Sequence, residues 1–170
     1  MSFEVQPMHA GDLDQVLALQ ARSYPETLHE DAAFYKSRLA SSPQSIWVAR
    51  KDFAVLGYLV SYPWNGQVLP ALNAEGSKDQ SQGKFWFLHD CAVSPDARGL
   101  GVGKALIQHG LAYAKLAGFQ AACLVSLSDA INYWQGLGYT PDSEANARWR
   151  ADLVPYGHRA AYMTLSLSTE

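Results

Sequence analysis

A glycine-rich stretch in the middle of the chain carries residues suited to holding phosphate groups. Three glycines alternate with apolar residues between two basic ones, in the order Arg98, Gly99, Leu100, Gly101, Val102, Gly103, Lys104. An apolar run at 85–93 precedes the stretch, and a segment with helical periodicity follows it. Glycines placed between a strand and a helix leave backbone N–H groups uncovered at the positive end of the helix dipole. The stretch therefore predicts a site for the phosphate or pyrophosphate of a cofactor.

The spacing of the glycines distinguishes between three kinds of phosphate-binding loop. A Walker loop ends in Gly-Lys-Ser/Thr, but Ala105 follows Lys104 here, so the hydroxyl that binds magnesium is missing. A dinucleotide fingerprint needs Gly-x-Gly-x-x-Gly in an opening βαβ unit, whereas these glycines are evenly spaced and lie far into the chain. The pattern Arg/Gln-x-x-Gly-x-Gly/Ala fits, through Arg98, Gly101 and Gly103. It resembles the pyrophosphate loop of the GNAT family of N-acetyltransferases, which bind acetyl-CoA.

A second motif of that family is similar to a segment further along this chain. The family's signature helix ends in Phe-Tyr-x-x-x-Gly-Phe, and here Tyr133 and Trp134 precede Gly138 and Tyr139. The resemblance covers most of the chain and is most specific between residues 85 and 139. It implies that the acetyl group and pantetheine arm of acetyl-CoA lie against the backbone of a splayed strand at Cys91, Ala92 and Val93. It also implies that residues 99–104 hold the pyrophosphate.

His89 is the main catalytic candidate. An ammonium acceptor must lose a proton before its nitrogen can attack, and a histidine near neutrality can take that proton directly or through water. Strand alternation predicts that Phe87, His89 and Cys91 share one face and that Asp90 lies on the other. A structural histidine in the core is the alternative. The run 88–95 also looks like the corresponding strand of the arylalkylamine N-acetyltransferases, which carries two histidines; His89 matches the second and Phe87 replaces the first, so a single base is expected.

Two aromatic residues are candidates for contacts with the departing thiolate. Many members of the family have a tyrosine at the position of Trp134, but an indole N–H is not a usable acid, so Trp134 is expected to contact pantetheine or its sulfur. Tyr133 is an alternative acid, with a core role as the other interpretation. Cys91 raises the alternative of a covalent acetyl-cysteine, which needs an activating base. Because residues two apart on a strand lie roughly 7 Å apart, direct attack in a ternary complex is favoured.

The residues that could receive the amine are less distinctive. In the family, the acceptor site is bordered by regions that correspond here to those with Tyr24, Glu26 and Trp64. Phe87 lies on the neighbouring strand that carries His89. Aromatic rings together with Glu26, Glu30 or Asp31 would suit a cationic amine. A solvated helix start with scattered aromatic residues is the alternative.

The elements that must position these residues follow from hydrophobic periodicity. Strands are expected at 3–6, 45–50, 55–62, 85–93, 121–126 and 159–167, and helices at 11–22, 29–39, after the glycines, and at 130–137 with Ser128 as N-cap. The resemblance implies one α/β domain over residues 1–170, with a mixed twisted sheet of about seven strands, splayed at the acetyl-CoA site, and about four helices. The polar stretch 65–84 is long for a connection in a compact domain and is expected to be mobile or functional.

Composition excludes several classes of protein. The 170 residues are 48% hydrophobic and 17% charged, and the formal charge of −3 argues against a nucleic-acid-binding protein. No apolar run reaches the length of a membrane span, and no signal peptide is evident. Two distant cysteines in apolar runs suggest buried thiols in a reducing cytoplasm and no metal site.

These features together predict a cytoplasmic N-acetyltransferase that uses acetyl-CoA and no metal. The expected acceptor is a primary amine on a small molecule, with arylalkylamines and polyamines as leading classes. The alternative is a non-catalytic CoA-binding sensor or interaction module with the same fold, and a homodimer is left open.

Overall fold

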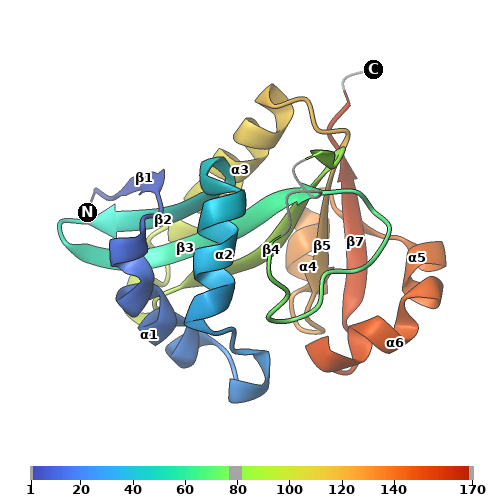
Figure 1. The fold of residues 1–170 in the computed structure, drawn as a ribbon, viewed down its shortest axis with the longest axis horizontal. Coiled ribbons are helices and arrows are strands. Elements are labelled where there is room, and N and C mark those ends of the chain that lie inside the picture. The colour runs from blue at the N-terminus through green and yellow to red at the C-terminus, as the bar shows by residue number, and fades with distance from the viewer. Residues whose placement is uncertain (1, 77–81, 169–170) are drawn as a thin grey trace.

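One seven-stranded sheet runs through the centre of the fold (Figure 1). The computed structural model describes residues 2–76 and 82–168. The strands lie in the order β1-β2-β3-β4-β5-β7-β6, and only the β4–β5 pair is parallel. Their bounds are β1 Glu4–Pro7, β2 Ile46–Lys51, β3 Ala54–Trp64, β4 Phe85–Val93, β5 Ala121–Ser126, β6 Thr140–Pro141 and β7 Ala161–Ser166.

Helices cover both faces of the sheet (Figure 1). The described part of the chain contains six of them: α1 Leu13–Ser23, α2 Ala32–Ser41, α3 Val102–Leu116, α4 Ile131–Gly136, α5 Ser143–Arg148 and α6 Arg150–Leu153. One core cluster joins α1 and α2 to the first half of the sheet, a second joins α5 and α6 to the other half, and a third lies on the opposite face under α3. The expected single α/β domain with a mixed seven-stranded sheet is confirmed, with about two helices more than expected.

β4 separates from β5 partway along its length. The parallel pairing begins at Phe85 opposite Ala121 and ends at Leu88 opposite Leu124, whereas β4 itself continues to Val93. The pairing of β4 with β3 continues on its other edge as far as Val93. The second half of β4 therefore has one edge directed into a gap in the sheet.

A β-bulge lies at the start of this gap. Val60 of β3 pairs with Asp90 and Ser61 pairs with Leu88, so His89 is an extra residue in β4. A bulge of this kind shifts the alternation of side chains along the strand that carries it. The prediction that Asp90 lies on the face opposite His89 is therefore wrong, because both side chains contact residues of the α1–α2 face.

Most elements expected from periodicity are present within one to three residues of their predicted bounds. The proposed N-cap Ser128 is wrong: α4 follows a turn, its N-cap residue is Ala130, and no side chain caps it. The short elements β6, α5 and α6 were not predicted, because each is too short to show a period. Of the stretch expected to be mobile, residues 77–81 lie outside the described residues.

Candidate active site

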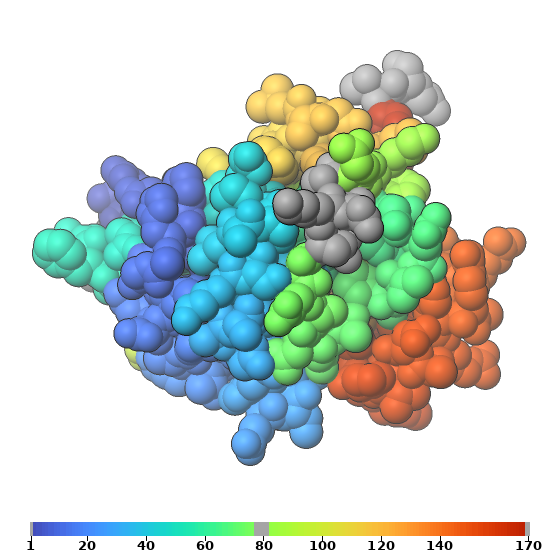
Figure 2. Space-filling view, viewed as in Figure 1, coloured from blue at the N-terminus to red at the C-terminus, as the bar shows by residue number. Residues whose placement is uncertain are grey.

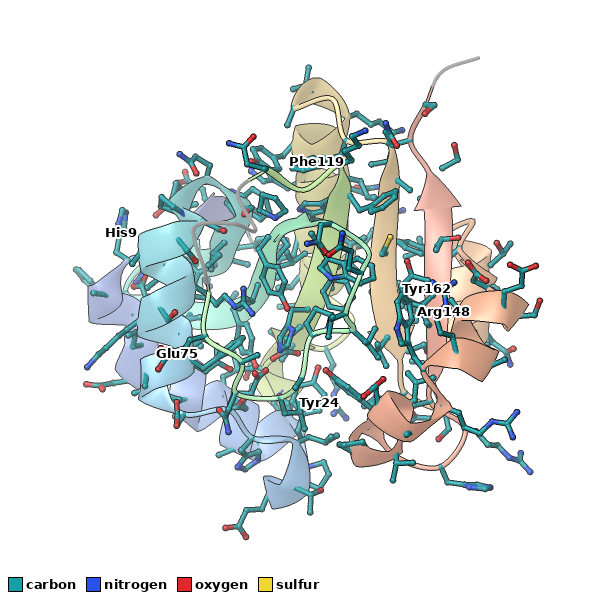
Figure 3. All side chains as sticks on the ribbon, turned by 45° about the vertical axis from the view of Figure 1, so that its right-hand side comes forward. His9, Tyr24, Glu75, Phe119, Arg148 and Tyr162 are labelled. Atoms are coloured by element: carbon teal, nitrogen blue, oxygen red, sulfur yellow. The ribbon has the colours of Figure 1, made fainter. Side chains whose placement is uncertain are left out.

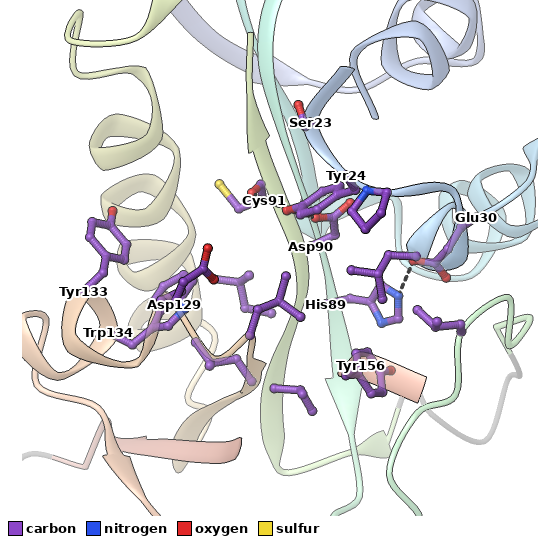
Figure 4. Close-up of a pocket in the computed structure, with 18 residues that line it drawn as sticks. Ser23, Tyr24, Glu30, His89, Asp90, Cys91, Asp129, Tyr133, Trp134 and Tyr156 are labelled. Carbon is purple, nitrogen blue, oxygen red and sulfur yellow. Dashed lines mark hydrogen bonds and ion pairs between the residues drawn. The ribbon is translucent and has the colours of Figure 1, made fainter. Parts of the chain in front are cut away.

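A cleft of about 410 Å³ lies where β4 leaves β5 (Figure 4). β4 forms its floor through 88–91. The connection between α1 and α2 forms one wall, and the start of α4 with the end of β5 forms the other. Its lining residues are Ser23, Tyr24, Pro25, Leu28, Glu30, Leu72, Leu88, His89, Asp90, Cys91, Leu124, Val125, Leu127, Asp129, Ala130, Tyr133, Trp134 and Tyr156.

His89 forms a close pair with Glu30 in this cleft. His89 Nε2 lies 2.6 Å from Glu30 Oε1, and the two side chains are only 2% and 3% exposed. Figure 4 shows the pair on the wall opposite Trp134 and Tyr133. Glu30 is held by its own backbone, since its N–H donates to Gln20 Oε1 and its carbonyl accepts from Gln20 Nε2. The carboxylate therefore has a fixed position beside the imidazole.

The second nitrogen of the imidazole is also engaged. His89 Nδ1 lies 2.7 Å from the hydroxyl of Tyr62, a residue that is fully buried. An ionised carboxylate only accepts hydrogen bonds, so Nε2 carries a proton toward Glu30, and on a neutral ring the Tyr62 hydroxyl then donates to Nδ1. The guanidinium of Arg38 lies 3.6 Å from the centre of the Tyr62 ring. His89 is thus one member of a chain that runs from Glu30 to Tyr62.

A second, partly buried carboxylate lies next to this pair. Asp90 accepts hydrogen bonds from the hydroxyls of Tyr24, at 2.7 Å, and Tyr58, at 2.6 Å. Burial raises the pKa of the Asp90 carboxyl, and the two tyrosine hydrogen bonds oppose that rise. The Tyr24 hydroxyl also lies 3.0 Å from the carbonyl oxygen of Cys91, so it bridges two consecutive residues of β4. Tyr24 therefore ties the α1–α2 connection to the floor of the cleft.

Cys91 points away from His89. Its side chain packs with the core cluster under α3, whereas His89 contacts Glu30 and Phe34 on the opposite face. Figure 4 shows the two side chains directed to opposite sides of β4. Burial, and after it the carboxylate of Asp90, raises the pKa of the Cys91 thiol. The expectation that Cys91 and His89 share a face is wrong, so His89 does not lie beside the thiol as the base that covalent catalysis would need.

The other wall carries the two aromatic residues expected near the thiol. Trp134 is partly buried and packs against Tyr139, with ring centres 5.5 Å apart. Tyr133 is about half exposed and lines the cleft beside it, and burial raises the pKa of its hydroxyl. In Figure 4 the Tyr133 hydroxyl and the Cys91 sulfur lie on the same side of β4. A phenol there can donate a proton into the gap, which an indole cannot.

The glycine-rich stretch forms the amino end of α3. Gly99 and Gly101 have φ angles of 80° and 78°, and an added Cβ at either would meet nothing within 4 Å. Gly101 is the N-cap residue, and no side chain caps the helix. Arg98 and Lys104 are both exposed at its edges. Open backbone at the positive end of a fifteen-residue helix fits a pyrophosphate.

The structure brings together only part of the predicted acceptor site. Tyr24 lines the cleft, but Glu26 is exposed in a turn and is not among the lining residues. Trp64 and Phe87 are buried, at 2% and 1% exposure, in the core cluster under α5 and α6. Neither ring reaches the cleft, because alternation directs both into that core.

Sequence reasoning assigned Glu30 only as one of three possible partners for an amine, it placed Tyr156 only in a late loop near the acceptor site, and it missed Tyr62. No pattern in the sequence marks these residues, since Glu30 lies 59 residues from His89. Tyr156 lines the cleft and donates to the carbonyl of Pro70 at 2.6 Å.

The ionisable side chains that line the cleft are mainly acidic. Glu30, Asp90 and Asp129 line it, and no lysine or arginine is among its described lining residues. The remaining lining is mostly apolar or aromatic. Such a surface favours a cation with an apolar body over an anion.

Residues 2–76 and 82–168 contain neither a candidate metal site nor a candidate membrane span. No cluster of three or more His, Cys, Asp or Glu side chains there could hold a metal ion. Every helix in those ranges is too short or too polar to cross a membrane.

Comparison with known proteins agrees with this architecture. The model of the acetyltransferase (GNAT) family matches residues 13–139. No curated protein matches the chain in sequence.

Three solved structures illustrate the shared fold. The loading GNATL domain of CurA from Lyngbya majuscula superimposes with a TM-score of 0.76, at 14% identity over 98% of both chains. Ard1 from Thermoplasma volcanium superimposes with a TM-score of 0.74, at 15% identity over 99% of this chain and 100% of its own. The GphF GNAT-like decarboxylase in complex with isobutyryl-CoA superimposes with a TM-score of 0.70, at 20% identity over 97% of this chain and 100% of its own. None of these likenesses singles out the arylalkylamine N-acetyltransferases, so that finer similarity stays a prediction.

Proposed function

The chain belongs to the acetyltransferase (GNAT) family and is an acyltransferase; we propose that it transfers acetyl from acetyl-CoA to a small primary amine by direct attack in a ternary complex. The observation that carries the proposal is the buried Glu30–His89 pair, which faces the cleft where β4 separates from β5. The alternative, a CoA-binding module without turnover, has no need of a buried proton-accepting pair in that position.

The glycine-rich loop would hold the pyrophosphate of acetyl-CoA. Its open backbone, with Arg98 and Lys104 at the edges, suits an anion. The free edge of β4 at Cys91, Ala92 and Val93 would hold the pantetheine arm. The similar GphF structure is a complex with isobutyryl-CoA, which supports an acyl-CoA as the ligand of this fold. When bound, acetyl-CoA supplies an activated acetyl thioester.

The Glu30–His89 pair would accept the proton that the acceptor loses. An ammonium group beside Glu30 donates a hydrogen bond to the carboxylate, and its proton passes to the pair directly or through one water. The Tyr62 hydroxyl and Gln20 hold the two members in place. The neutral nitrogen then forms the new C–N bond as the C–S bond breaks. Tyr133, or water, gives a proton to the departing sulfur, and the nitrogen loses its second proton to water as the amide forms, which restores the proton of the donor.

The acceptor class follows from the cleft charges. Three carboxylates and no described lysine or arginine in the lining favour an amine without a carboxylate of its own. Tyr24, Tyr156 and the leucines of the lining would contact an apolar or aromatic body. An arylalkylamine therefore fits better than an amino acid, and a polyamine is the second class.

A thiol-release assay with acetyl-CoA tests the proposal. The acceptors are tryptamine and tryptophan as a matched pair, phenethylamine, spermidine, a lysine peptide and a blank without amine. We expect release that depends on the amine and is faster with tryptamine than with tryptophan. If no amine causes thiol release while CoA still stabilises the protein, the non-catalytic alternative would be favoured.

A further inference from the structure

The described part of the β3–β4 connection, residues 65–76, makes a direct contact with the Glu30–His89 pair. The backbone N–H of Asn73 donates to Glu30 Oε2 at 3.0 Å. The side-chain Oδ1 of Asn73 accepts from the backbone N–H of Asp31 at 2.8 Å. One residue of this connection therefore holds both the carboxylate of the pair and the backbone beside it.

Asn73 makes these contacts in a conformation that few residues adopt. Its φ angle is 59°, in the left-handed region that asparagine tolerates better than most side chains. A turn surrounds it, closed by a hydrogen bond of 3.2 Å from the N–H of Ala74 to the carbonyl of Ala71. In this turn the N–H of Asn73 points at Glu30, and the left-handed φ favours asparagine or glycine at this position.

The same turn is fastened to α2. Arg38 Nη2 donates to the carbonyl of Ala74 at 2.8 Å, and the N–H of Gly76 donates to Ser37 Oγ at 2.8 Å. Figure 3 shows Glu75 beside α2, and Figure 2 shows the connection filling the surface between α2 and the C-terminal helices. Leu72, one residue before Asn73, lines the cleft. The turn thus reaches from the outer surface to the acceptor side of the cleft.

We propose that Asn73 is a positioning residue that holds the Glu30 carboxylate so that its Oε1 faces His89. Glu30 Oε1 contacts His89 and Oε2 contacts Asn73, so the two hydrogen bonds together fix the rotation of the carboxylate. Partners in the second layer of a site commonly set the orientation of a functional group in this way. The catalytic consequence rests on the proposed function, whereas the orientation itself does not.

Two variants of Asn73 separate its backbone from its side chain. Asn73→Val disfavours the left-handed conformation, and Asn73→Gly permits it. Both remove the acceptor for Asp31, so the difference between them reports the position of the backbone N–H. We expect Asn73→Val to lower kcat on the order of 10-fold, with little change in KM for acetyl-CoA, and Asn73→Gly, which loses only the contact with Asp31, to lower kcat less. If Asn73→Val does not fold, Asn73→Ala replaces it.

A double-mutant cycle ties the effect to Glu30. In a Glu30→Gln background, where the carboxylate is already gone, Asn73→Val should lower kcat much less than in the parent. An equal loss in both backgrounds would overturn the proposal, because it would mean a general effect on folding.

The nitrogen-15 NMR signals of the His89 ring provide a readout that needs no turnover. Asn73→Val should shift the Nε2 signal, while Asn73→Gly should leave it close to that of the parent. Unchanged signals in a folded Asn73→Val protein would overturn the positioning role. A parent that acetylates no amine would count against the proposed function, and a shift confined to Asn73→Val would still support the placement of Glu30.

Discussion

At the scale of single residues, the proposed proton transfer would use a pair of side chains rather than one histidine. His89 contacts Glu30 through one ring nitrogen and Tyr62 through the other. In the proposed reaction, a proton that leaves an ammonium acceptor would therefore enter a network whose members are already ordered. Such ordering lowers the cost of reorganisation during the reaction.

Removing the imidazole should slow turnover without preventing acetyl-CoA binding. We expect His89→Ala to lower kcat by roughly 100-fold, in the usual range for a lost general base. The loss should be greatest at low pH, where less of the amine is already neutral. Initial rates between about pH 6 and 9 measure this, with binding followed separately.

His109→Ala is the matched control for this measurement. His109 is exposed on α3 and packs against Trp47, outside the cleft lining. It should behave as the parent does. If His89→Ala and His109→Ala had the same rates at every pH, His89 would have no part in proton transfer.

The ionisation of the Asp90 carboxyl should lower the stability of the folded protein as the pH rises. Burial raises the pKa of its carboxyl in the folded state, against the hydrogen bonds from Tyr58 and Tyr24 and the charge of His89, while Glu30 raises it further. The folded protein then binds this proton more tightly than the unfolded chain does. The corresponding stability is present below the ordinary aspartate pKa of about 4 and is lost as the pH rises through the raised pKa.

Asp90→Asn removes this titration and keeps an acceptor for the tyrosines. The melting temperature of the variant, relative to the parent, should therefore increase between about pH 4 and pH 7. A difference that stays constant across this range would mean that the pKa of Asp90 is not raised.

At the scale of elements, the bulge in β4 and the amino end of α3 create the two halves of the site. The bulge brings His89 and Asp90 to the same face of the sheet, close to Glu30 and Tyr24. The glycines at the start of α3 leave its backbone open on the side where β4 and β5 separate. Neither half depends on an unusual side chain.

Gly101→Glu should abolish acetyl-CoA binding. The substitution places a negative charge at the positive end of α3, in the space that the pyrophosphate would occupy. It also strains a residue with a φ of 78°, at a cost of roughly 1–2 kcal/mol. Calorimetric titration with CoA measures the loss.

Gly118→Glu provides the matched control at the other end of the same helix. Gly118 is exposed, has a φ of 81° and has nothing within 4 Å of an added Cβ. The two variants therefore share the backbone strain, and only Gly101→Glu changes the predicted phosphate site. Equal CoA affinity in both would mean that the glycine-rich loop does not bind the pyrophosphate.

At the scale of the whole molecule, the cleft lies between two halves of the sheet. β1–β4 with α1 and α2 form one half, and β5–β7 with α4, α5 and α6 form the other (Figure 1). The parallel pairing of β4 with β5 joins the two halves of the sheet along part of this line, and core residues also pack across it. A ligand in the gap would contact both halves and should stabilise the folded state.

CoA should therefore raise the melting temperature, and ATP should not. A ligand at 100 times its Kd stabilises the native state by about 2.7 kcal/mol. For a domain of this size the corresponding shift is roughly 5–10 °C. A thermal-shift titration measures it, and a larger effect of ATP than of CoA would indicate a nucleotide-binding domain instead.

Local features of the fold and site could be read from the sequence. The glycine spacing predicted an open helix start, and periodicity predicted most strands and helices, because glycine conformations and helix or strand periods depend on neighbouring residues. The same locality explains why β6, α5 and α6 were missed: segments of two to six residues show too little of a period.

Only the tertiary structure determined how the cleft residues meet. The Glu30–His89 pair joins residues 59 apart, and the contact from Asn73 comes from a third segment. The bulge at His89 results from the register between β3 and β4, which no local pattern specifies. Trp64 and Phe87 entered the core instead of the acceptor site because the strands carry them to a packed face. The sequence alone thus determined the family and the open backbone at the start of α3, while long-range packing decided which side chains line the cleft.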